Sequence, residues 1–130
     1  MEIPELAELI WLFEDEPTPE YPDLGWPAGL HSFRLHRGDR EVLFSLDPLA
    51  GDAYISLFAG GQEMVQLGRL RRIETLRIVK DDGCEGLVLN FVGGKLEPVS
   101  LQTKPVLWLR WDVMPLGTWG LVPGPSRSSS

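Results

Sequence analysis

The stretch Ser32–Leu46, SFRLHRGDREVLFSL, holds two alternating apolar runs on either side of a Gly-Asp pair. A two-residue turn with glycine in the first position is typical of a β-hairpin, because glycine readily adopts the positive φ that such a turn needs. With Gly38 and Asp39 at the turn, Phe33 pairs with Phe44. The turn chemistry and the apolar alternation agree on this register, so the stretch predicts an antiparallel hairpin with one buried face.

A second hairpin is expected in residues 53–67, AYISLFAGGQEMVQL, around Gly60 and Gly61. Strict alternation from this turn gives two mixed faces. One face holds Ile55, Leu57 and Met64, and the other holds Tyr54, Phe58, Val65 and Leu67. Both faces are therefore expected to be covered, one of them by the N-terminal helix.

The remaining strands follow the same pattern of short apolar runs between glycine turns. In the run LRRIETLRIVK, residues 70–80, apolar residues recur at every third position, whereas Leu76 and Ile78 alternate as in a strand. We predict a strand from about Ile73. An Asp-Asp-Gly turn at 81–83 leads into GLVLNFV, and Gly93-Gly94 leads into KLEPVSLQ, where Pro98 indicates a bulge or an edge. The run VLWLRWDV, residues 106–113, closes the set.

Residues 4–14, PELAELIWLFE, predict a helix, because apolar residues recur there at i, i+3, i+4 and i+7. The expected buried stripe is Leu6, Leu9, Ile10 and Phe13. Pro4 suits the first helical position, where a missing N–H costs nothing. Trp11 and Leu12 widen the stripe, so we expect the helix to pack against the sheet.

The fold class expected from these elements is α+β. It consists of a mainly antiparallel, twisted sheet of about seven or eight short strands, which can curl towards a half-barrel, with one N-terminal helix packed on it. A single domain is expected over residues 1–114, with the helix at 4–14, a proline-rich loop without regular structure at 15–29 and antiparallel strands at 31–113. The Pro/Gly/Ser-rich residues 115–130 predict a flexible C-terminal tail.

Charge is unevenly distributed along the chain, which has a net charge of −7. Residues 1–33 hold eight acids and no lysine or arginine, whereas residues 69–80 hold five bases around a single Glu74. Two interpretations stay open: the two segments screen each other within the fold, or one of them faces an oppositely charged partner. An acidic chain without a long apolar run is not expected to bind nucleic acid or to span a membrane.

Sequence motifs for catalysis or metal binding are lacking. The chain has no dinucleotide fingerprint, phosphate-binding loop or nucleophile elbow. His31 and His36 are five residues apart on one strand, so they leave opposite faces and cannot share a metal ion. No metal, cofactor or catalytic residue is therefore assigned. The lone Cys84 excludes an intrachain disulfide, and we expect a cytoplasmic protein.

Two tryptophans in the last strand differ in their expected environment. Alternation places Leu107, Leu109 and Trp111 on one apolar face, which predicts that Trp111 belongs to the core. Trp108 and Arg110 fall on the other, mixed face. Either the helix or the proline-rich loop covers Trp108, or Trp108 is an aromatic anchor beside an arginine, a composition typical of interface hot spots.

The function expected from these features is that of a non-enzymatic protein-binding module, with the acidic N-terminal segment as its contact surface. The partner is another protein with a basic surface, and a cover for a basic toxin, an immunity-type role, is one concrete form of this hypothesis. The candidate partner-binding residues are Glu14, Asp15, Glu16, Tyr21, Trp26, Trp108 and Arg110. The chain itself is expected to be a monomer or a homodimer.

Two other functions stay open. The first is a small-molecule site in the mouth of a curled sheet, lined by Phe44, Phe58 and Phe91. The second is an enzyme that uses His36 with Ser32 and a carboxylate, because Ser32, Arg34 and His36 share one strand face.

Overall fold

The computed structural model describes residues 1–94 and 96–111 of the chain. The tail predicted at 115–130 and the end of the last predicted strand, residues 112 and 113, lie outside the described residues. The described elements, in chain order, are α1 (Leu6–Phe13), β1 (Thr18–Pro19), β2 (His31–Arg37), β3 (Arg40–Asp47), β4 (Asp52–Ala59), β5 (Gln62–Leu70), β6 (Ile73–Asp81), β7 (Cys84–Phe91), the 3-10 turn η1 (Val92–Gly94), β8 (Val99–Lys104) and β9 (Trp108–Trp111).

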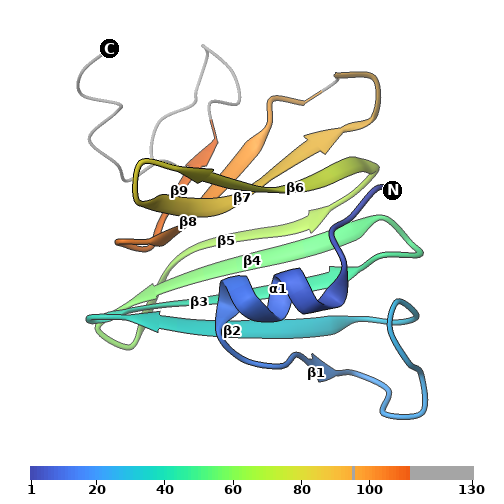
Figure 1. The fold of residues 1–130 in the computed structure, drawn as a ribbon, viewed down its shortest axis with the longest axis horizontal. Helices are drawn as coiled ribbons and strands as arrows, with labels where there is room; N and C mark the ends of the chain where they lie inside the picture. Colours follow the sequence, from blue (N-terminus) through green and yellow to red (C-terminus); the bar gives the residue numbers. More distant parts are fainter. Residues whose placement is uncertain (95, 112–130) are drawn as a thin grey trace.

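The strands form two antiparallel sheets rather than the single sheet expected from the sequence. The first has the order β1-β2-β3-β4-β5 and the second β6-β7-β8-β9 (Figure 1). The division falls at Arg71 and Arg72, between β5 and β6. Arg72 has φ of 60°, and this left-handed backbone turns the chain out of the first sheet. The α+β class is confirmed, and its strands are divided between two layers.

The hairpin predicted at Gly38-Asp39 is confirmed with its register. Phe33 lies opposite Phe44, and both side chains are buried. Helix α1 lies against this pair, because the Phe13 ring stacks on Phe33 at 5.1 Å and on Phe44 at 5.6 Å between ring centroids. The helix therefore packs on the Phe33–Phe44 pair, whose register follows from the Gly38-Asp39 turn.

Helix α1 is shorter than expected, and its buried face is rotated. Leu9, Leu12 and Phe13 are buried, whereas Leu6 and Ile10 of the predicted stripe are only partly buried. Glu8 caps the first turn by accepting a hydrogen bond from the Glu5 backbone N–H at 3.1 Å. The residues before α1 contact the second sheet, because Glu2 forms a parallel β-bridge with Thr75 of β6. The helix therefore closes the side of the sandwich between β2 and β6 (Figure 1).

Strand β5 departs from the predicted alternation because of a β-bulge. Leu57 of β4 pairs with Val65, but the next residue, Phe58, pairs with Glu63, so Met64 is the additional residue. The extra residue moves Val65 and Leu67 to the buried face and leaves Met64 58% exposed. The predicted mixed faces for residues 53–67 are therefore wrong.

Residues 15–29 hold one short regular element that the proline content argued against. Thr18 and Pro19 form β1, paired with Ser32 and His31 at the edge of the first sheet. Proline is compatible with an edge strand because its missing N–H leaves no ladder position empty. The two sheets and α1 share one apolar cluster, so a single core holds the described chain together.

Candidate partner-binding surface

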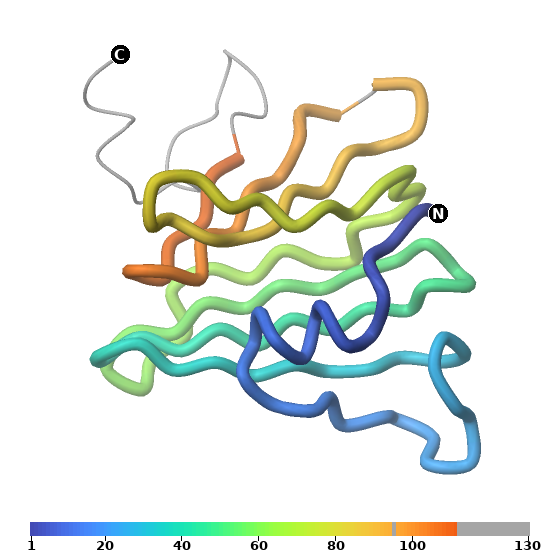
Figure 2. The backbone as a smooth tube through the Cα atoms, in the orientation of Figure 1, coloured from blue at the N-terminus to red at the C-terminus, as the bar shows by residue number. Residues whose placement is uncertain are grey.

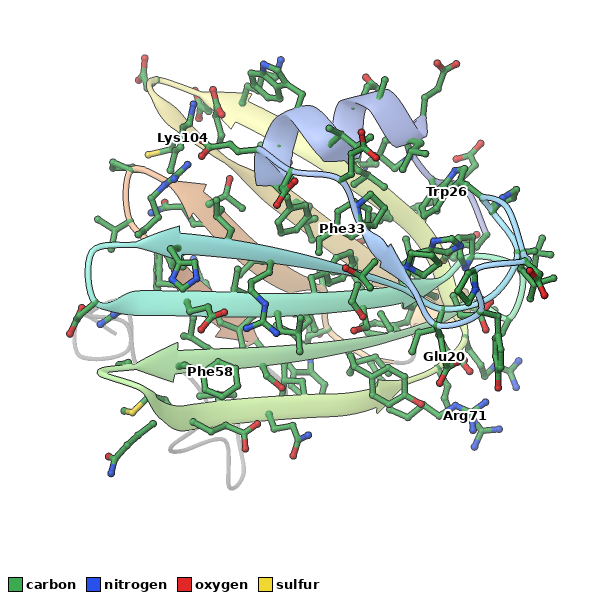
Figure 3. The ribbon with its side chains drawn as sticks, turned by 90° about the horizontal axis from the view of Figure 1, so that it is seen from below. Glu20, Trp26, Phe33, Phe58, Arg71 and Lys104 are labelled. Atoms are coloured by element: carbon green, nitrogen blue, oxygen red, sulfur yellow. The ribbon has the colours of Figure 1, made fainter. Side chains whose placement is uncertain are left out.

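The two ends of the sandwich carry different elements. One end, named here the hairpin end, holds the β2–β3, β6–β7 and β8–β9 turns and faces the C-terminus of α1 (Figure 2). The opposite end, the loop end, holds the β1–β2 loop, the β3–β4 turn, the β5–β6 link and η1. Figure 3 shows Lys104 towards the hairpin end and Glu20, Trp26 and Arg71 towards the loop end. The predicted binding residues divide between them.

Glu14 is held at the hairpin end by Arg37. The Arg37 guanidinium donates to both Glu14 carboxylate oxygens, at 2.7 and 3.2 Å, and its Nε donates to the Thr103 carbonyl oxygen at 2.9 Å. The hydrogen bond from Arg37 lowers the pKa of the Glu14 carboxyl, and Glu14 raises the pKa of Arg37 in return. One arginine thus ties the end of α1 to both sheets.

Asp15 and Glu16 follow on the exposed surface. Within the described residues they form no ion pair, and the Asp15 carboxylate accepts a hydrogen bond from the Glu16 backbone N–H at 2.8 Å. Neither they nor Glu14 bridge to the basic segment 69–80. That segment meets α1 through Lys80, whose ammonium lies 3.9 Å from the centroid of the Trp11 ring. Within the described residues, the acidic segment and the basic segment 69–80 therefore form no carboxylate–base pair that would screen their charges.

A hollow of about 280 Å³ lies on the outer face of the second sheet, and Trp108 and Arg110 both line it. Four of its lining residues lie side by side on neighbouring strands and form one row across the sheet: Val79, Gly86, Gln102 and Trp108. Gly86 contributes no side chain, so the floor between Val79 and Trp108 is low. A Cβ at Gly86 would lie 2.2 Å from the Leu101 carbonyl oxygen, so close strand approach requires glycine there.

Trp108 is half-buried in this hollow, because its neighbours in the row are small or polar. Helix α1 packs on the buried face of β2 and does not cover it. Trp111 is also only half-buried: its ring packs on the core and its Nε1 donates to the Glu97 carbonyl oxygen at 2.9 Å. The expectation that Trp111 is fully core is thus met only in part.

The hollow joins the α1 terminus through a chain of charged contacts. Glu85, on the rim of the hollow, lies 3.6 Å from the Lys104 ammonium. Lys104 is in turn 5.7 Å from the centroid of the Trp11 ring, in the last turn of α1. Lys104 therefore lies between the rim of the hollow at Glu85 and the last turn of α1 at Trp11, at the hairpin end.

Tyr21 and Trp26 lie at the loop end and are separated from the other five residues. Tyr21 is 58% exposed. Trp26 is partly buried, with its ring centroid 5.1 Å from that of His31 and 6.3 Å from that of Phe33. Trp26 thus packs on the core and pins the proline-rich loop.

The residues named for the two other functions are dispersed. Phe44 and Phe91 fill the core, whereas Phe58 lies on the opposite face of the first sheet. The Ser32 hydroxyl is hydrogen-bonded to the Ser45 hydroxyl at 2.7 Å. His36 lies 3.5 Å from the Glu41 carboxylate, which also pairs with Arg34. Within residues 1–94 and 96–111, no cluster of His, Cys, Asp and Glu could hold a metal ion.

Sequence reasoning missed Arg37 and Gly86, which shape the surface. Arg37 stands directly before the predicted Gly38-Asp39 turn, and its contacts with Glu14 and Thr103 are 23 and 66 residues away in the chain. Gly86 is the first residue of the predicted strand run GLVLNFV, and a glycine in a strand was the available signal for close backbone approach there.

Comparison with known proteins shows a shared fold. No family model and no curated protein match the chain. A chain of a solved structure, described as a contact-dependent growth inhibition toxin–immunity protein complex from Klebsiella pneumoniae 342, aligns with a TM-score of 0.69 and 15% sequence identity. The alignment covers 84% of this chain and 93% of that chain. None of the helices in the described part of the chain is long and apolar enough to cross a membrane.

Proposed function

We propose that this chain is a non-enzymatic protein-binding module of the immunity type, which covers a toxic protein partner in a stoichiometric complex. The contact surface is the hairpin end, with Glu14, Asp15 and Glu16 beside the hollow that Trp108 and Arg110 line. The partner presents a basic surface to it.

The observation that carries the proposal is the fold likeness to a chain of a toxin–immunity complex over nearly the whole of that chain. A fold by itself hosts many functions, so the surface has to support the same conclusion. At the hairpin end, Glu14 and Glu85 have basic partners, whereas Asp15, Glu16, Asp81 and Asp82 have no ion pair within the described residues. The surplus charge there is negative and would attract a basic protein.

Trp108 supplies the apolar part of the proposed contact. A half-buried tryptophan in a shallow hollow can be covered fully by a partner, and tryptophan is enriched among residues that dominate binding energy. Its neighbours Val79 and Gly86 leave room for a partner side chain on the indole face. The acids around it would act on the association rate, and Trp108 on the dissociation rate.

The test is neutralisation of a toxic partner. A protein from the same source that arrests growth when expressed alone should form a 1:1 complex with this chain, and co-expression of this chain should restore growth. Trp108→Ala should weaken the complex about thirtyfold or more, since hot-spot truncations cost at least about 2 kcal/mol. Asp15→Lys with Glu16→Lys should slow association, and the effect should fade as salt is raised.

Matched controls lie on the outer face of the first sheet. Tyr54→Ala removes an aromatic side chain that is 36% exposed there, and Glu63→Lys reverses an exposed charge. Both should leave binding and rescue unchanged. A captured partner that is harmless to cells, or a rescue that survives every hairpin-end substitution, would contradict the proposal.

A further inference from the structure

We infer that the loop end is a two-fold docking surface for a second copy of this chain. The inference concerns the end opposite the proposed partner surface, so it stands or falls independently of the immunity-type function.

Sheet topology arranges the charges of the loop end. In the order β1-β2-β3-β4-β5, the loop after β1 lies at one edge, the β3–β4 turn in the middle and the link after β5 at the other edge. The first edge carries Glu20 and Asp23, and the other carries Arg71 and Arg72. Figures 1 and 3 both place the β1–β2 loop and the β5–β6 link at this end.

Backbone hydrogen bonds fix these segments to one another. The Glu20 N–H donates to the Leu30 carbonyl oxygen at 2.8 Å, which holds the acidic loop to the start of β2. The Ile73 N–H donates to the Gly51 carbonyl oxygen at 3.2 Å, which holds the basic link to the β3–β4 turn. The acidic and basic groups are thus mounted on one rigid sheet end.

The two charged flanks do not neutralise each other. Four strand spacings of about 4.8 Å separate the edges by about 19 Å, which exceeds the Debye length of about 8 Å at physiological ionic strength. Within the described residues none of these four side chains has an ion pair. Nearby Arg69, by contrast, is paired with Asp52 at 2.6 Å.

Exposed apolar side chains gather at the same end. Leu49, in the β3–β4 turn, is 73% exposed, and Tyr21 and Leu24 of the acidic loop are 58% and 42% exposed. Val92, whose N–H donates to the Arg72 carbonyl oxygen, is 41% exposed. Scattered single hydrophobics are normal on a surface, but here Leu49 lies between flanks of opposite charge and the other three lie within those flanks, as in an interface.

A two-fold axis near Leu49 satisfies this arrangement. In a two-fold contact residue i meets j while j meets i, so each copy's arginines face the other copy's acids and the two apolar centres meet. The charge pattern of this end is thus complementary to that of a second copy. The net charge of −7 on each copy opposes approach at long range, so the local pairs have to supply the specificity.

Charge exchange between two variants tests the inference. The full chain should show a concentration-dependent monomer–dimer equilibrium by sedimentation velocity. The pair Arg71→Glu/Arg72→Glu and the pair Glu20→Lys/Asp23→Lys should each raise the dimer dissociation constant about tenfold or more, because like charges then face each other. An equal mixture of the two variants should dimerise again, since both contacts in the mixed dimer are attractive.

Controls separate this result from non-specific charge effects and from misfolding. Arg77→Glu, an exposed reversal on β6, should not change the dimer. Circular dichroism melting checks that each variant folds. If a charge-reversal variant does not fold, the corresponding neutral substitution, Arg71→Gln or Glu20→Gln, is used in its place. A chain that stays monomeric at high concentration, a dimer that is insensitive to these reversals, or mixed species larger than a dimer would overturn the inference.

Discussion

At the scale of single residues, Arg37 connects parts of the molecule that are distant in sequence. Its Nε is bound to Thr103 of β8 and its two terminal nitrogens to Glu14 at the end of α1. Its side chain is only 20% exposed, whereas that of Glu14 is 45% exposed. The pair is therefore a charge-assisted hydrogen bond at the surface, and its contribution to stability is limited by solvent screening.

Replacing Glu14 by Gln should lower the free energy of unfolding at neutral pH by about 0–1 kcal/mol, as for exposed pairs. Because folding lowers the Glu14 pKa, its contribution is present above the unfolded pKa of about 4.3 and is lost as pH falls through the folded pKa. The difference between the original chain and Glu14→Gln should therefore shrink in acid. Urea unfolding at several pH values measures it.

The control for this prediction is Glu16→Gln, two residues away. Glu16 is exposed and has no ion pair within the described part of the chain. Its replacement should leave stability at neutral pH unchanged. An equal loss in both variants would mean that the Arg37 contact is not responsible.

At the scale of secondary-structure elements, the second sheet depends on close approach of β7 and β8 at Gly86. The register shifts between Glu85 and Gly86, and a Cβ would meet the Leu101 carbonyl oxygen at 2.2 Å and the Gln102 Cα at 2.9 Å. Both are backbone atoms and cannot rotate away. The same glycine leaves the floor of the Trp108 hollow open.

Gly86→Ala should therefore destabilise the fold by about 1–3 kcal/mol, as overpacking does. Gly25→Ala is a suitable comparison because nothing lies within 4 Å of its Cβ position, and it should stay within about 0.5 kcal/mol of the original chain. Chemical denaturation of the two variants measures both values. A neutral Gly86→Ala would show that β7 and β8 can separate there at little cost.

Elements set by local chemistry were predictable, and those set by distant contacts were not. The Gly38-Asp39 turn defines its own register, so the sequence predicted the Phe33–Phe44 pair. The bulge at Met64 has no such local signal, since Val65 and Met64 are both apolar and either could face the core. The rotation of α1 towards Leu12 likewise depends on the aromatic pair beneath Phe13.

At the scale of the whole molecule, the division into two sheets also depends on long-range packing. Alternation predicts strands but not which strands share a sheet, so the sequence yielded one sheet where the structure has two. The candidate surface shows the same limit. Trp108 and Arg110 were placed together on the mixed face of the last strand, and both line the hollow, yet only the fold reveals that the β1–β2 loop with Tyr21 and Trp26 lies at the opposite end.

The two sheets should unfold together because they share one core. Leu46 of β3 and Leu89 of β7 are each 0% exposed and belong to the same buried cluster, in which Phe13 of α1 also takes part. Removing either side chain leaves a cavity in this shared core. Leu89→Ala should therefore cost about 2–5 kcal/mol, and this loss should be felt by both sheets.

Native-state hydrogen exchange can distinguish a shared core from two independently stable layers. If unfolding is cooperative, Leu89→Ala lowers the protection of the most stable β3 amides as much as that of the β7 amides, although the substitution lies in the second sheet. Leu46→Ala provides the reciprocal measurement from the first sheet. A loss of protection confined to the sheet that carries the substitution would mean that each layer is stable alone. The continuity of the buried cluster argues for the first result, because Leu46 and Leu89 belong to the same cluster.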